Sequence, residues 1–547
     1  MLQDINKVVI IGAGGGANFY IAKFLRLCSI EVTAYDVKEN GNIKELASLG
    51  CKVIYSNPET YDFNAYDLVI YTIALPAPIQ KTISELNDSH KVYSAGAFYK
   101  KLVDAYELGE FNSNLEMTAF KDSNIAPLFS FNFKDCILIG ITGSKGKTTT
   151  SNMLYQALTS LGVKTSLVST LGARVLTKEL ETGLHTSTPS AQELAELFKQ
   201  MLEAGSKVIV VEVSSHGIAT GRITGLKFDI GVITNIQPEH LDFHRDIAEV
   251  IAVKETLITK HLKPSGKVIL NYDDNNIRQR VLPKVIKRFS DINLISFSRV
   301  PATVNTLVIQ EVKEDKARIN FELTESKTGS IESYEIPYSG KFNIYNVVPT
   351  ILVAKSLGFL YKDVARALLA LGVVSGRNEL VIDAKIKIIL DFAHTAESLE
   401  AILQTYKEQC PGKLIVVFGC AGQRDTLKRP RMGEVAAKYA DVTILAAEDP
   451  RTEDLGLIND QIEAGYNAYR SKHNLQDQTR LYRFDDTSGN TKNRRDAIVQ
   501  AISLASEGDI IICAGKGPEK SLCFGTTEYD WDERAEIIKL FNESAFK

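Results

Sequence analysis

The sequence lacks the features that mark membrane, exported and disordered proteins. None of its apolar runs approaches the ~18 residues that a membrane-spanning helix needs, and the run Val8–Ile11 is too short for the core of a signal peptide. There is no low-complexity tract, and 44% of the 547 residues are hydrophobic against 24% charged, unlike a disordered chain. We therefore expect a folded, soluble, cytoplasmic protein with no membrane partner.

An excess of either charge is also missing. The chain has 63 Lys and Arg residues against 67 Asp and Glu residues, a formal net charge of −4. A general nucleic-acid-binding protein would carry a pronounced basic excess. We expect no nucleic-acid partner, and we expect anionic ligands to be held by local sites.

Cysteine is scarce and has no motif spacing. The seven cysteines form no CxxC pair, and their number is odd. A disulfide framework or a cysteine zinc site would need regular pairs. We interpret the cysteines as reduced residues of the hydrophobic cores.

The order of sequence patterns predicts an α/β protein with three domains. At ~150 residues per domain the length allows three or four, and short β-branched runs alternate with helical periods, as in parallel sheets with crossover helices. We propose a Rossmann-like N-terminal domain, residues 1–112, a P-loop ATPase-like central domain, residues 113–375, and a Rossmann-like C-terminal domain, residues 376–547. Period-two segments around residues 290–340 predict a small antiparallel sheet beside the central parallel one. The polar stretch 109–124 is predicted to be a linker.

A glycine-rich turn follows the first predicted strand. Gly12, Gly14 and Ala17 fit the pattern GxGxxA, and Asp36 ends the next strand. This is the fingerprint of a dinucleotide site, although a different nucleotide or a plain tight turn would use the same glycines. A hydride-transfer site, which a dehydrogenase needs, is not recognisable downstream.

A phosphate-binding loop lies between a strand and a helix in the second predicted domain. After the run CILIGIT come Gly143, Ser144, Lys145, Gly146, Lys147, Thr148 and Thr149, which we predict to bind ATP. Backbone N–H groups of such a loop surround polyphosphate, its lysine reaches the β- and γ-phosphates, and its hydroxyl binds Mg²⁺. Ile141 stands where the generic motif has its first glycine, so this is a shorter variant.

Polar side chains follow several further strands. Glu212 ends one apolar run in the central domain, and Glu239 and His240 follow the next. Carboxylates and imidazoles that leave strand ends beside a phosphate loop favour metal or phosphate chemistry. In the last domain four strand ends carry polar motifs that include Asp391, Arg424, Arg451 and Glu519, a combination that suits an amino-acid substrate.

These motifs together resemble the Mur ligases, ATP-dependent enzymes that form the amide bonds of bacterial cell-wall precursors. TGSKGKTTT, EVSSHG, TNIQPEHLDFH, SGRNE, DFAHT, KRPRMGE, EDPR and AGKGPE occur in the family's order over nearly the whole chain. EVSSHG, DFAHT and KRPRMGE are most similar to the branch that adds the third residue, the UDP-N-acetylmuramoyl-tripeptide synthetases. The first domain is instead similar to those of the alanine- and glutamate-adding Mur ligases, where this unit holds the uridine nucleotide.

The resemblance implies roles for individual residues. The catalytic residues would be Lys147, Glu212, His240 and Lys254, and the Mg²⁺ ligands would be Thr148, Glu212, His240 and Lys254, the last as a CO₂-derived carbamate. Besides the phosphate loop, ATP would contact Asn271, Asn343, Asn346, Arg377 and Asp391. The UDP-substrate would contact Gly12, Gly14, Asp36, Ser187, Thr188, Ser214 and Arg222, and the incoming amino acid would contact Arg424, Asp449, Arg451, Gly515 and Glu519.

The implied reaction joins a third amino acid to UDP-N-acetylmuramoyl-L-Ala-D-Glu through an acyl phosphate, with a monomer acting on small molecules only. Retention of Arg451 favours meso-diaminopimelate, whereas Asp449, in place of the family's usual asparagine, leaves L-lysine possible. Three alternatives remain: a Mur-like ligase with another acceptor such as folate or another muramoyl peptide, an NAD-dependent dehydrogenase, and a catalytically silent nucleotide-binding scaffold.

Overall fold

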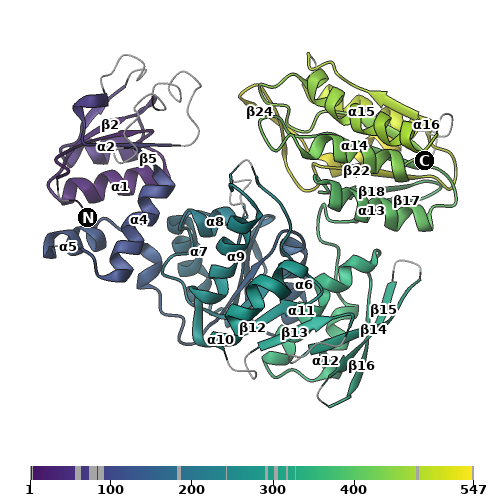
Figure 1. Ribbon diagram of the computed structural model, residues 1–547, viewed down its shortest axis with the longest axis horizontal. Coiled ribbons are helices and arrows are strands. Elements are labelled where there is room, and N and C mark those ends of the chain that lie inside the picture. The colour runs from purple at the N-terminus through teal and green to yellow at the C-terminus, as the bar shows by residue number, and fades with distance from the viewer. Residues whose placement is uncertain are drawn as a thin grey trace.

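The computed structural model describes most of the 547 residues. It leaves out residues 1, 3, 56–62, 73–82, 84–91, 112, 181–186, 242, 290–293, 301–305, 316–317, 327, 476–479, 489 and 545–547, and the side chains of Ala17, Asn64 and Glu107. The chain runs from the purple N-terminal part at the left of Figure 1, through the teal centre, to the yellow C-terminal part at the upper right.

The first sheet is parallel and has the strand order β3-β2-β1-β4-β5. This order is that of a Rossmann fold without its sixth strand, so the predicted Rossmann-like fold is confirmed. Its elements are β1 (Lys7–Ile11), α1 (Gly16–Leu27), β2 (Glu31–Tyr35), α2 (Gly41–Ser48), β3 (Lys52–Ile54), η2 (Phe63–Ala65), β4 (Leu68–Tyr71), β5 (Val92–Ser94) and α4 (Ala95–Leu108).

The central sheet has the order β16-β15-β14-β13-β12-β11-β6-β10-β7-β8-β9 within the described residues. The seven strands from β14 to β7 in this order are parallel to one another. Antiparallel strands extend the sheet at both ends, β15 and β16 beside β14, and β8 and β9 beside β7. The antiparallel sheet predicted around residues 290–340 is therefore present and continues the parallel one. The elements are η3 (Pro127–Ser130), β6 (Ile137–Thr142), α6 (Lys147–Ser160), β7 (Thr165–Ser169), β8 (Gly172–Val175), β9 (Lys178–Leu180), α7 (Ala191–Glu203), β10 (Val208–Glu212), α8 (Ser215–Ala219), β11 (Phe228–Ile233), α9 (Ile247–Thr259), β12 (Leu262–Asn271), η4 (Ile277–Val281), α10 (Leu282–Arg288), β13 (Leu294–Ser298), β14 (Thr306–Asp315), β15 (Arg318–Glu325), β16 (Ile331–Ile336), η5 (Lys341–Asn343), α11 (Ile344–Ser356) and α12 (Tyr361–Leu369).

The last sheet has the order β17-β18-β22-β19-β20-β21, parallel except for β17. Its elements, with a separate hairpin β23-β24, are β17 (Glu379–Asp383), β18 (Lys387–Asp391), α13 (Ala396–Gln409), β19 (Leu414–Phe418), α14 (Lys428–Tyr439), β20 (Val442–Leu445), α15 (Leu455–Lys472), β21 (Arg480–Arg483), α16 (Lys492–Leu504), β22 (Ile510–Ala514), β23 (Ser521–Phe524), β24 (Thr527–Asp530) and α17 (Glu533–Asn542).

Two glycines on adjacent central strands allow α9 to pack closely on the sheet. Gly140 of β6 lies opposite Gly231 of β11. A Cβ atom at Gly231 would lie 2.5 Å from Ile258 of α9, and one at Gly140 would lie 3.0 Å from Leu257. This close approach brings Lys254, also on α9, within reach of the loop that follows β6.

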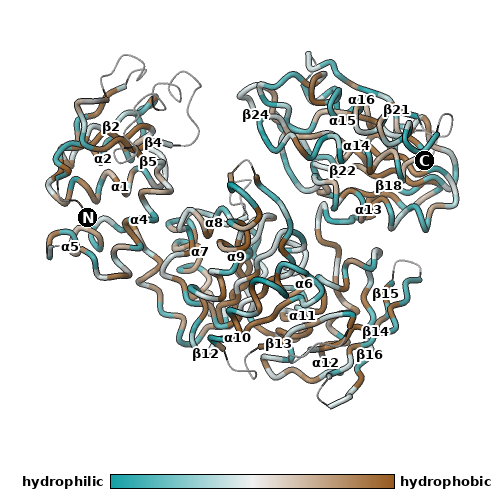
Figure 2. Tube along the Cα trace, in the orientation of Figure 1, coloured by the Kyte–Doolittle hydropathy of each residue, from teal (hydrophilic) through white to brown (hydrophobic). Residues whose placement is uncertain are grey.

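The hydrophobic cores do not follow the sheets one by one. A single cluster of buried side chains runs from β1 and α1 of the first sheet through Phe120 and Leu128 into one face of the central sheet. The last sheet has cores of its own on its two faces. In Figure 2 the central strands of the sheets are brown, as buried apolar strands should be. The first two sheets are thus joined by apolar packing, whereas the last is packed separately.

The segment predicted as a linker, residues 109–124, is not an extended connection. It contains α5 (Asn114–Asp122), which is capped by Ser113 and buries Ala119 and Phe120. Phe120 stacks on Tyr106 with 4.3 Å between ring centroids and lies edge-on to Phe24 of α1. The helix is held by aromatic contacts with distant residues, which explains why its own sequence shows no clear period.

Two further features concern the length of the apolar helices and the state of the cysteines. No helix among the described residues is long and apolar enough to cross a membrane. All seven cysteines are described, none is in a disulfide, and five are buried.

Candidate active site

The phosphate loop follows β6 and opens α6. Gly146 has a φ of +82°, and a Cβ atom there would lie 2.1 Å from Asn346 Oδ1, so the loop accepts only glycine at this position. Lys147 Nζ donates to the carbonyl oxygens of Gly143, at 2.8 Å, and Ser144, at 3.1 Å. The loop is therefore already closed around its lysine. Thr149 is buried on the first turn of α6.

Glu212 meets the loop hydroxyl at the carboxyl end of β10. Thr148 Oγ1 donates to Glu212 Oε1 at 3.0 Å, and the Thr170 N–H donates to the other carboxylate oxygen at 2.9 Å. The side chains of Thr148 and Glu212 are buried. A hydroxyl and a carboxylate oxygen side by side at a phosphate loop are hard oxygen donors, which fit the coordination that Mg²⁺ prefers.

Lys254 reaches the same loop from α9. Its ammonium group is fully buried, donates to the Gly143 carbonyl at 2.8 Å and forms an ion pair with Glu239 at 2.7 Å. Burial lowers the pKa of Lys254 to about 8, with Lys147 contributing to the shift and Glu239 opposing it. Burial alone would raise the pKa of Glu239, but Lys254 and Lys147 together bring it below its usual range.

His240, predicted as a metal ligand, lies in a group of aromatic rings. It has a φ of +51°, and its ring meets that of His216 edge-on at 4.8 Å. Among the residues that the structure describes, no three His, Cys, Asp or Glu side chains are arranged to hold a metal ion. Thr148 and Glu212 would hold a metal here together with phosphate oxygens, and the role of His240 as a further ligand stays a prediction.

The last domain contributes an arginine to the phosphate loop. Arg377 Nη2 donates to Thr148 Oγ1 at 3.2 Å, and its guanidinium lies over the Phe392 ring at 4.4 Å. Asp391 accepts the N–H of Asn378 at 2.6 Å, and burial raises the pKa of its carboxyl. The predicted ATP residues of two domains therefore meet at one hydroxyl.

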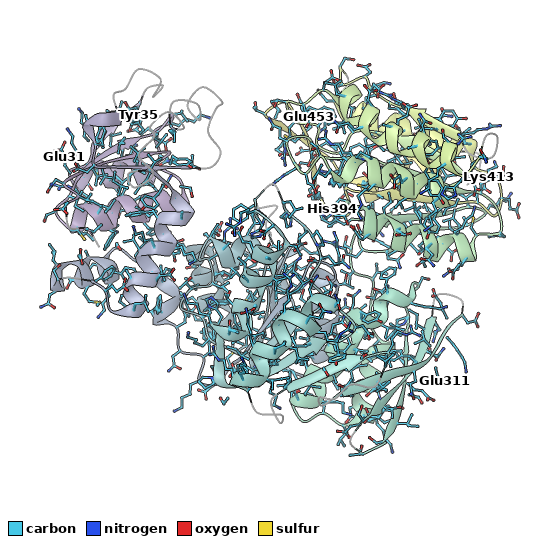
Figure 3. The ribbon with its side chains drawn as sticks, viewed as in Figure 1. Glu31, Tyr35, Glu311, His394, Lys413 and Glu453 are labelled. Carbon is cyan, nitrogen blue, oxygen red and sulfur yellow. The ribbon has the colours of Figure 1, made fainter. Side chains whose placement is uncertain are left out.

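Lys145 of the phosphate loop and His394 of the last domain lie close together at the same junction, where the charge of Lys145 acts on the histidine ring. Burial lowers the pKa of Lys145 to about 8, in the field of Glu239 and Lys147. Burial also lowers the pKa of His394 well below its usual value, with Lys145 and Lys428 adding to the effect. Figure 3 shows His394 on the side of the last domain that faces the central one. Positive charge is concentrated around the loop, as polyphosphate binding requires.

Four residues predicted to contact the UDP-substrate form one hydrogen-bonded group beside Glu212. Thr188 Oγ1 lies 3.0 Å from the Glu212 carbonyl and accepts the N–H of Ser214 at 2.8 Å, while Arg222 donates to the Thr188 carbonyl at 2.7 Å. Ser187 accepts a hydrogen bond from Thr170 at 2.7 Å. The structure thus brings Ser187, Thr188, Ser214 and Arg222 together next to the phosphate loop.

The first-domain residues lie apart from this group, in the turn after β1. Asp36 Oδ2 accepts the N–H of Gly14 at 2.8 Å, and Gly12 has a φ of +75°. The Asn42 side chain donates to the Gly14 carbonyl at 3.0 Å. The aspartate therefore braces the turn itself.

The predicted adenine-side asparagines are engaged within the protein. Asn271 donates to the Thr234 carbonyl at 2.9 Å, Asn343 donates to the Ser339 carbonyl at 2.8 Å, and Asn346 donates to Asn343 at 2.9 Å. Asn346 lies against the phosphate loop, because its Oδ1 would be only 2.1 Å from a Cβ atom at Gly146. A role for Asn271 and Asn343 toward adenine stays a prediction.

Lys516 forms an ion pair with Asp449, the aspartate that replaces the usual asparagine in the predicted amino-acid site. Lys516 is almost fully buried and forms ion pairs with Asp449 at 2.9 Å and Glu519 at 2.6 Å. Asp449 Oδ1 also accepts the N–H of Cys523 at 2.9 Å. Lys516 thus shares its positive charge between Asp449 and Glu519 and partly offsets the negative charge that Asp449 adds.

Glu448 adds a buried carboxyl group to this region. A Cβ atom on Gly515 would lie 2.9 Å from Glu448 Oε2, an atom that has no hydrogen-bond partner in the described part of the structure. Burial raises the pKa of Glu448 to about 7, although Lys428 and Lys516 oppose the shift.

The two arginines predicted to bind carboxylate lie on neighbouring loops. Arg424 is exposed after β19, and Arg451, half-buried, follows β20 with a φ of +55°. Arg451 Nη1 lies 3.3 Å from the Gly422 carbonyl, which joins the two loops.

Comparison with known proteins identifies the family. Residues 141–354 match the family described as Mur ligase middle domain, and residues 376–517 match the Mur ligase, glutamate ligase domain. The chain is 32% identical to the UDP-N-acetylmuramoyl-L-alanyl-D-glutamate–2,6-diaminopimelate ligase of Alkaliphilus oremlandii over 74% of its length and 77% of that protein's, and 34% identical to the ligase of the same name from Thermosynechococcus vestitus over 76% and 79%.

The chain belongs to the Mur ligase family. It is therefore an ATP-dependent ligase that forms amide bonds. Solved structures share its fold: a UDP-N-acetylmuramoyl-L-alanyl-D-glutamate–2,6-diaminopimelate ligase has a TM-score of 0.53 at 22% identity, covering 94% of this chain and 93% of its own. A MurF ligase from Thermotoga maritima has a TM-score of 0.54 at 14% identity, covering 94% of both chains. The three-domain α/β prediction is confirmed.

Three residues of this Mur ligase site were not predicted: Thr170, Lys516 and Glu448. Each lies at or just beyond the carboxyl end of a parallel strand, β7, β22 and β20 respectively. Glu448 and Lys516 lie inside the recognised motifs EDPR and AGKGPE, and applying the strand-end rule to β7 would have found Thr170.

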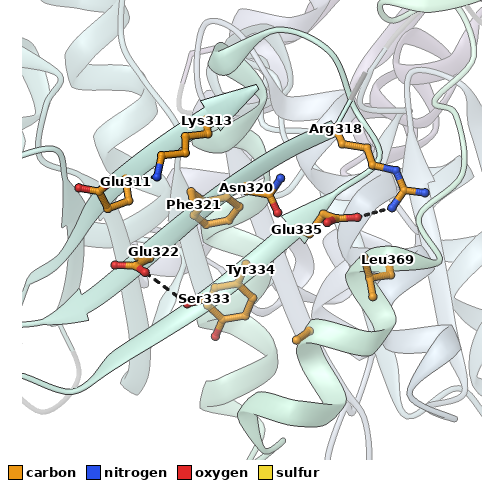
Figure 4. A pocket seen from close by; sticks show the side chains of 11 residues that line it. Glu311, Lys313, Arg318, Asn320, Phe321, Glu322, Ser333, Tyr334, Glu335 and Leu369 are labelled. Atoms are coloured by element: carbon orange, nitrogen blue, oxygen red, sulfur yellow. Dashed lines mark hydrogen bonds and ion pairs between the residues drawn. The ribbon is translucent and has the colours of Figure 1, made fainter. Parts of the chain in front are cut away.

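A cavity of about 690 Å³ lies elsewhere, on β14–β16 and α12. Figure 4 shows that charges of both signs surround it, including Lys313 and Glu322, with Tyr334 and Leu369. None of the predicted site residues lines it.

Proposed function

We propose that this Mur ligase adds meso-diaminopimelate to UDP-N-acetylmuramoyl-L-Ala-D-Glu. The main support is the hydrogen-bonded path from the phosphate loop, through Thr148 and Glu212, to Thr188. A γ-phosphate held by the loop would then lie close to the carboxylate of a substrate bound at Thr188. The names of the relatives, which cover about three quarters of the chain, support the same substrates.

Mg²⁺ and a carbamate complete the proposed site. Thr148 and Glu212 fit a magnesium ion, which would neutralise charge on the β- and γ-phosphates. The buried Lys254 Nζ lies 2.8 Å from the Gly143 carbonyl oxygen in the phosphate loop. A carbamate on this nitrogen would add two anionic oxygens beside the loop, where they could serve as metal ligands. His240 is proposed as the remaining ligand.

The proposed reaction has two steps. A carboxylate oxygen of the terminal D-glutamate bonds to the γ-phosphorus of ATP while the bond from that phosphorus to ADP breaks. The amine of the amino acid then bonds to the acyl carbon, phosphate leaves, and a proton is released. Lys147 and Arg377 stabilise the charge on the transferring group, because both lie at the loop.

Charge balance favours diaminopimelate over lysine. Asp449 alone would attract a terminal amine, but Lys516 and the Cys523 N–H already satisfy its Oδ1. Arg424 and Arg451 then leave the pocket able to bind a distal carboxylate. The uridine nucleotide is proposed to lie on the turn formed by Gly12, Gly14 and Asp36.

The deciding experiment is phosphate release from ATP by the purified protein with Mg²⁺ and UDP-N-acetylmuramoyl-L-Ala-D-Glu. Release stimulated by meso-diaminopimelate, and much less by L-lysine, is expected. Stimulation by lysine alone would overturn the choice of amino acid. Absence of stimulation by either would overturn the acceptor. Incubation with ¹³C-bicarbonate should give a carbamate NMR signal that Lys254→Arg removes.

A further inference from the structure

Arg429, near the start of α14, is one of the largest fully buried side chains in the molecule. Its two terminal nitrogens donate to both carboxylate oxygens of Glu453, at 2.6 and 2.9 Å. They also donate to Gln461 at 3.0 Å and to the Ala421 carbonyl at 3.3 Å. This fork-to-fork geometry fixes the relative orientation of the two groups as well as their distance.

The pair joins the two loops that carry the proposed carboxylate-binding arginines. Glu453 Oε2 also accepts the N–H of Gln423 at 2.9 Å, directly before Arg424. Glu453 itself stands two residues after Arg451. Figure 3 places Glu453 on the side of the last domain opposite Lys413. One ion pair between a buried arginine and a half-buried glutamate thus ties together both loop segments and α14.

These loops need such a tie because their backbones are strained. Gln423, Asp449 and Arg451 have φ values of +56°, +49° and +55°, a region that non-glycine residues rarely adopt. The loops also touch: the Gly422 N–H donates to the Asp449 carbonyl at 2.9 Å. Strained conformations persist only where the surroundings over-determine them, and the Arg429–Glu453 pair supplies that constraint.

We propose that Arg429 and Glu453 are positioning residues that set the preference for an amino acid with a distal carboxylate. They act by holding Arg424 and Arg451 in the geometry for one carboxylate. The inference rests on the proposed function. A lysine at position 429 keeps the charge but loses the two-pronged contact, so both loops would relax.

The test measures kcat and KM for meso-diaminopimelate, L-lysine and ATP in Arg429→Lys and Glu453→Gln. Arg495→Lys is the matched control, since Arg495 makes an equally bidentate pair with Glu536 on α16 and α17, away from these loops. We expect KM for diaminopimelate to rise at least tenfold in both variants, with discrimination against lysine falling by a similar factor. KM for ATP should stay within twofold, and the control should keep its discrimination.

A lower melting temperature with unchanged discrimination would overturn the inference, because a purely structural pair behaves that way. Should Arg429→Lys fail to fold, Glu453→Gln, which keeps the side-chain volume, decides the question, with ADP binding as the check on folding. If wild-type protein does not respond to diaminopimelate at all, the proposed function falls and this inference with it. If the wild-type protein responds to diaminopimelate but the variants keep its KM and its discrimination against lysine, the inference is wrong and the proposed function stands.

Discussion

At the scale of single residues, the site is assembled from groups that already satisfy one another. Glu212 holds Thr148 and Thr170, and Lys516 holds Asp449 and Glu519. Ligand binding therefore exchanges one set of polar contacts for another, and little reorganisation is needed.

Glu212→Gln should reduce ATP-dependent ligation by about 10²–10³-fold or more, since it removes an anionic oxygen from the place where phosphate charge is transferred. Phosphate release measures the loss, and circular dichroism should show the fold intact. Thr170→Val, which removes only a hydroxyl contact to Glu212, should cost less. Full activity in Glu212→Gln would refute the metal assignment.

Glu448 should make stability depend on pH. Its carboxyl has a pKa of about 7 in the folded protein, above its ordinary value of 4.5, so folding favours the protonated form. The stabilisation is complete below pH 4.5 and is lost as the pH rises through 7, by an amount on the order of 1–3 kcal/mol. Glu448→Gln should lack this loss. Urea unfolding of both proteins at pH 5 and pH 8 measures the difference, and equal pH dependence would contradict the prediction.

At the scale of elements, helix α6 shows how backbone conformation and ligand site are combined. Glycines precede and follow it, Gly146 and Gly162, both with a φ of +82°. Only at Gly146 would a side chain meet another group, Asn346, whereas nothing lies within 4 Å of a Cβ at Gly162.

Gly162→Ala should therefore cost only the strain of a left-handed residue, about 1–2 kcal/mol, and leave ATP binding unchanged. Gly146→Ala should cost that strain and also displace Asn346, so ATP binding should be lost. Isothermal titration with ATP and thermal unfolding separate the two effects. Similar ATP affinity in both variants would show that the loop can adjust.

The sequence predicted those parts of the elements that depend on local pattern. The phosphate loop and the strand ends with Glu212, Asp391 and Arg451 follow from alternation and motif spacing. The helix α5 was missed because it is held partly by Phe24, which lies 96 positions before Phe120 in the chain. The balance of Asp449 by Lys516 and the contact of Arg377 with Thr148 join residues 67 and 229 positions apart, which spacing alone does not reveal.

At the scale of the whole molecule, the cores divide the chain into two cooperative parts. The first sheet and the central sheet share one cluster, and the last domain has separate clusters. The last domain meets the phosphate loop through polar contacts such as that of Arg377. Polar contacts are exchanged easily, so this domain can close on ligands.

Calorimetry should show two unfolding transitions. Phe120→Ala, in the shared core, and Leu399→Ala, in a core of the last domain, each remove a buried side chain and should cost about 2–5 kcal/mol. Each should lower a different transition. Three transitions, or one that both substitutions lower together, would contradict the division.

The shared core also limits how this protein can be recombined. The sequence predicts a first domain different from the one usual in its branch of the family, which invites chimeras in which it is replaced by a relative's. A junction placed between α4 and α5 would cut through the aromatic cluster of Tyr106, Phe111 and Phe120 and leave an apolar surface unmatched on both sides. An exchange that keeps this core intact must carry the segment up to η3 with the incoming domain. The segment to be exchanged is therefore longer than the Rossmann-like sheet.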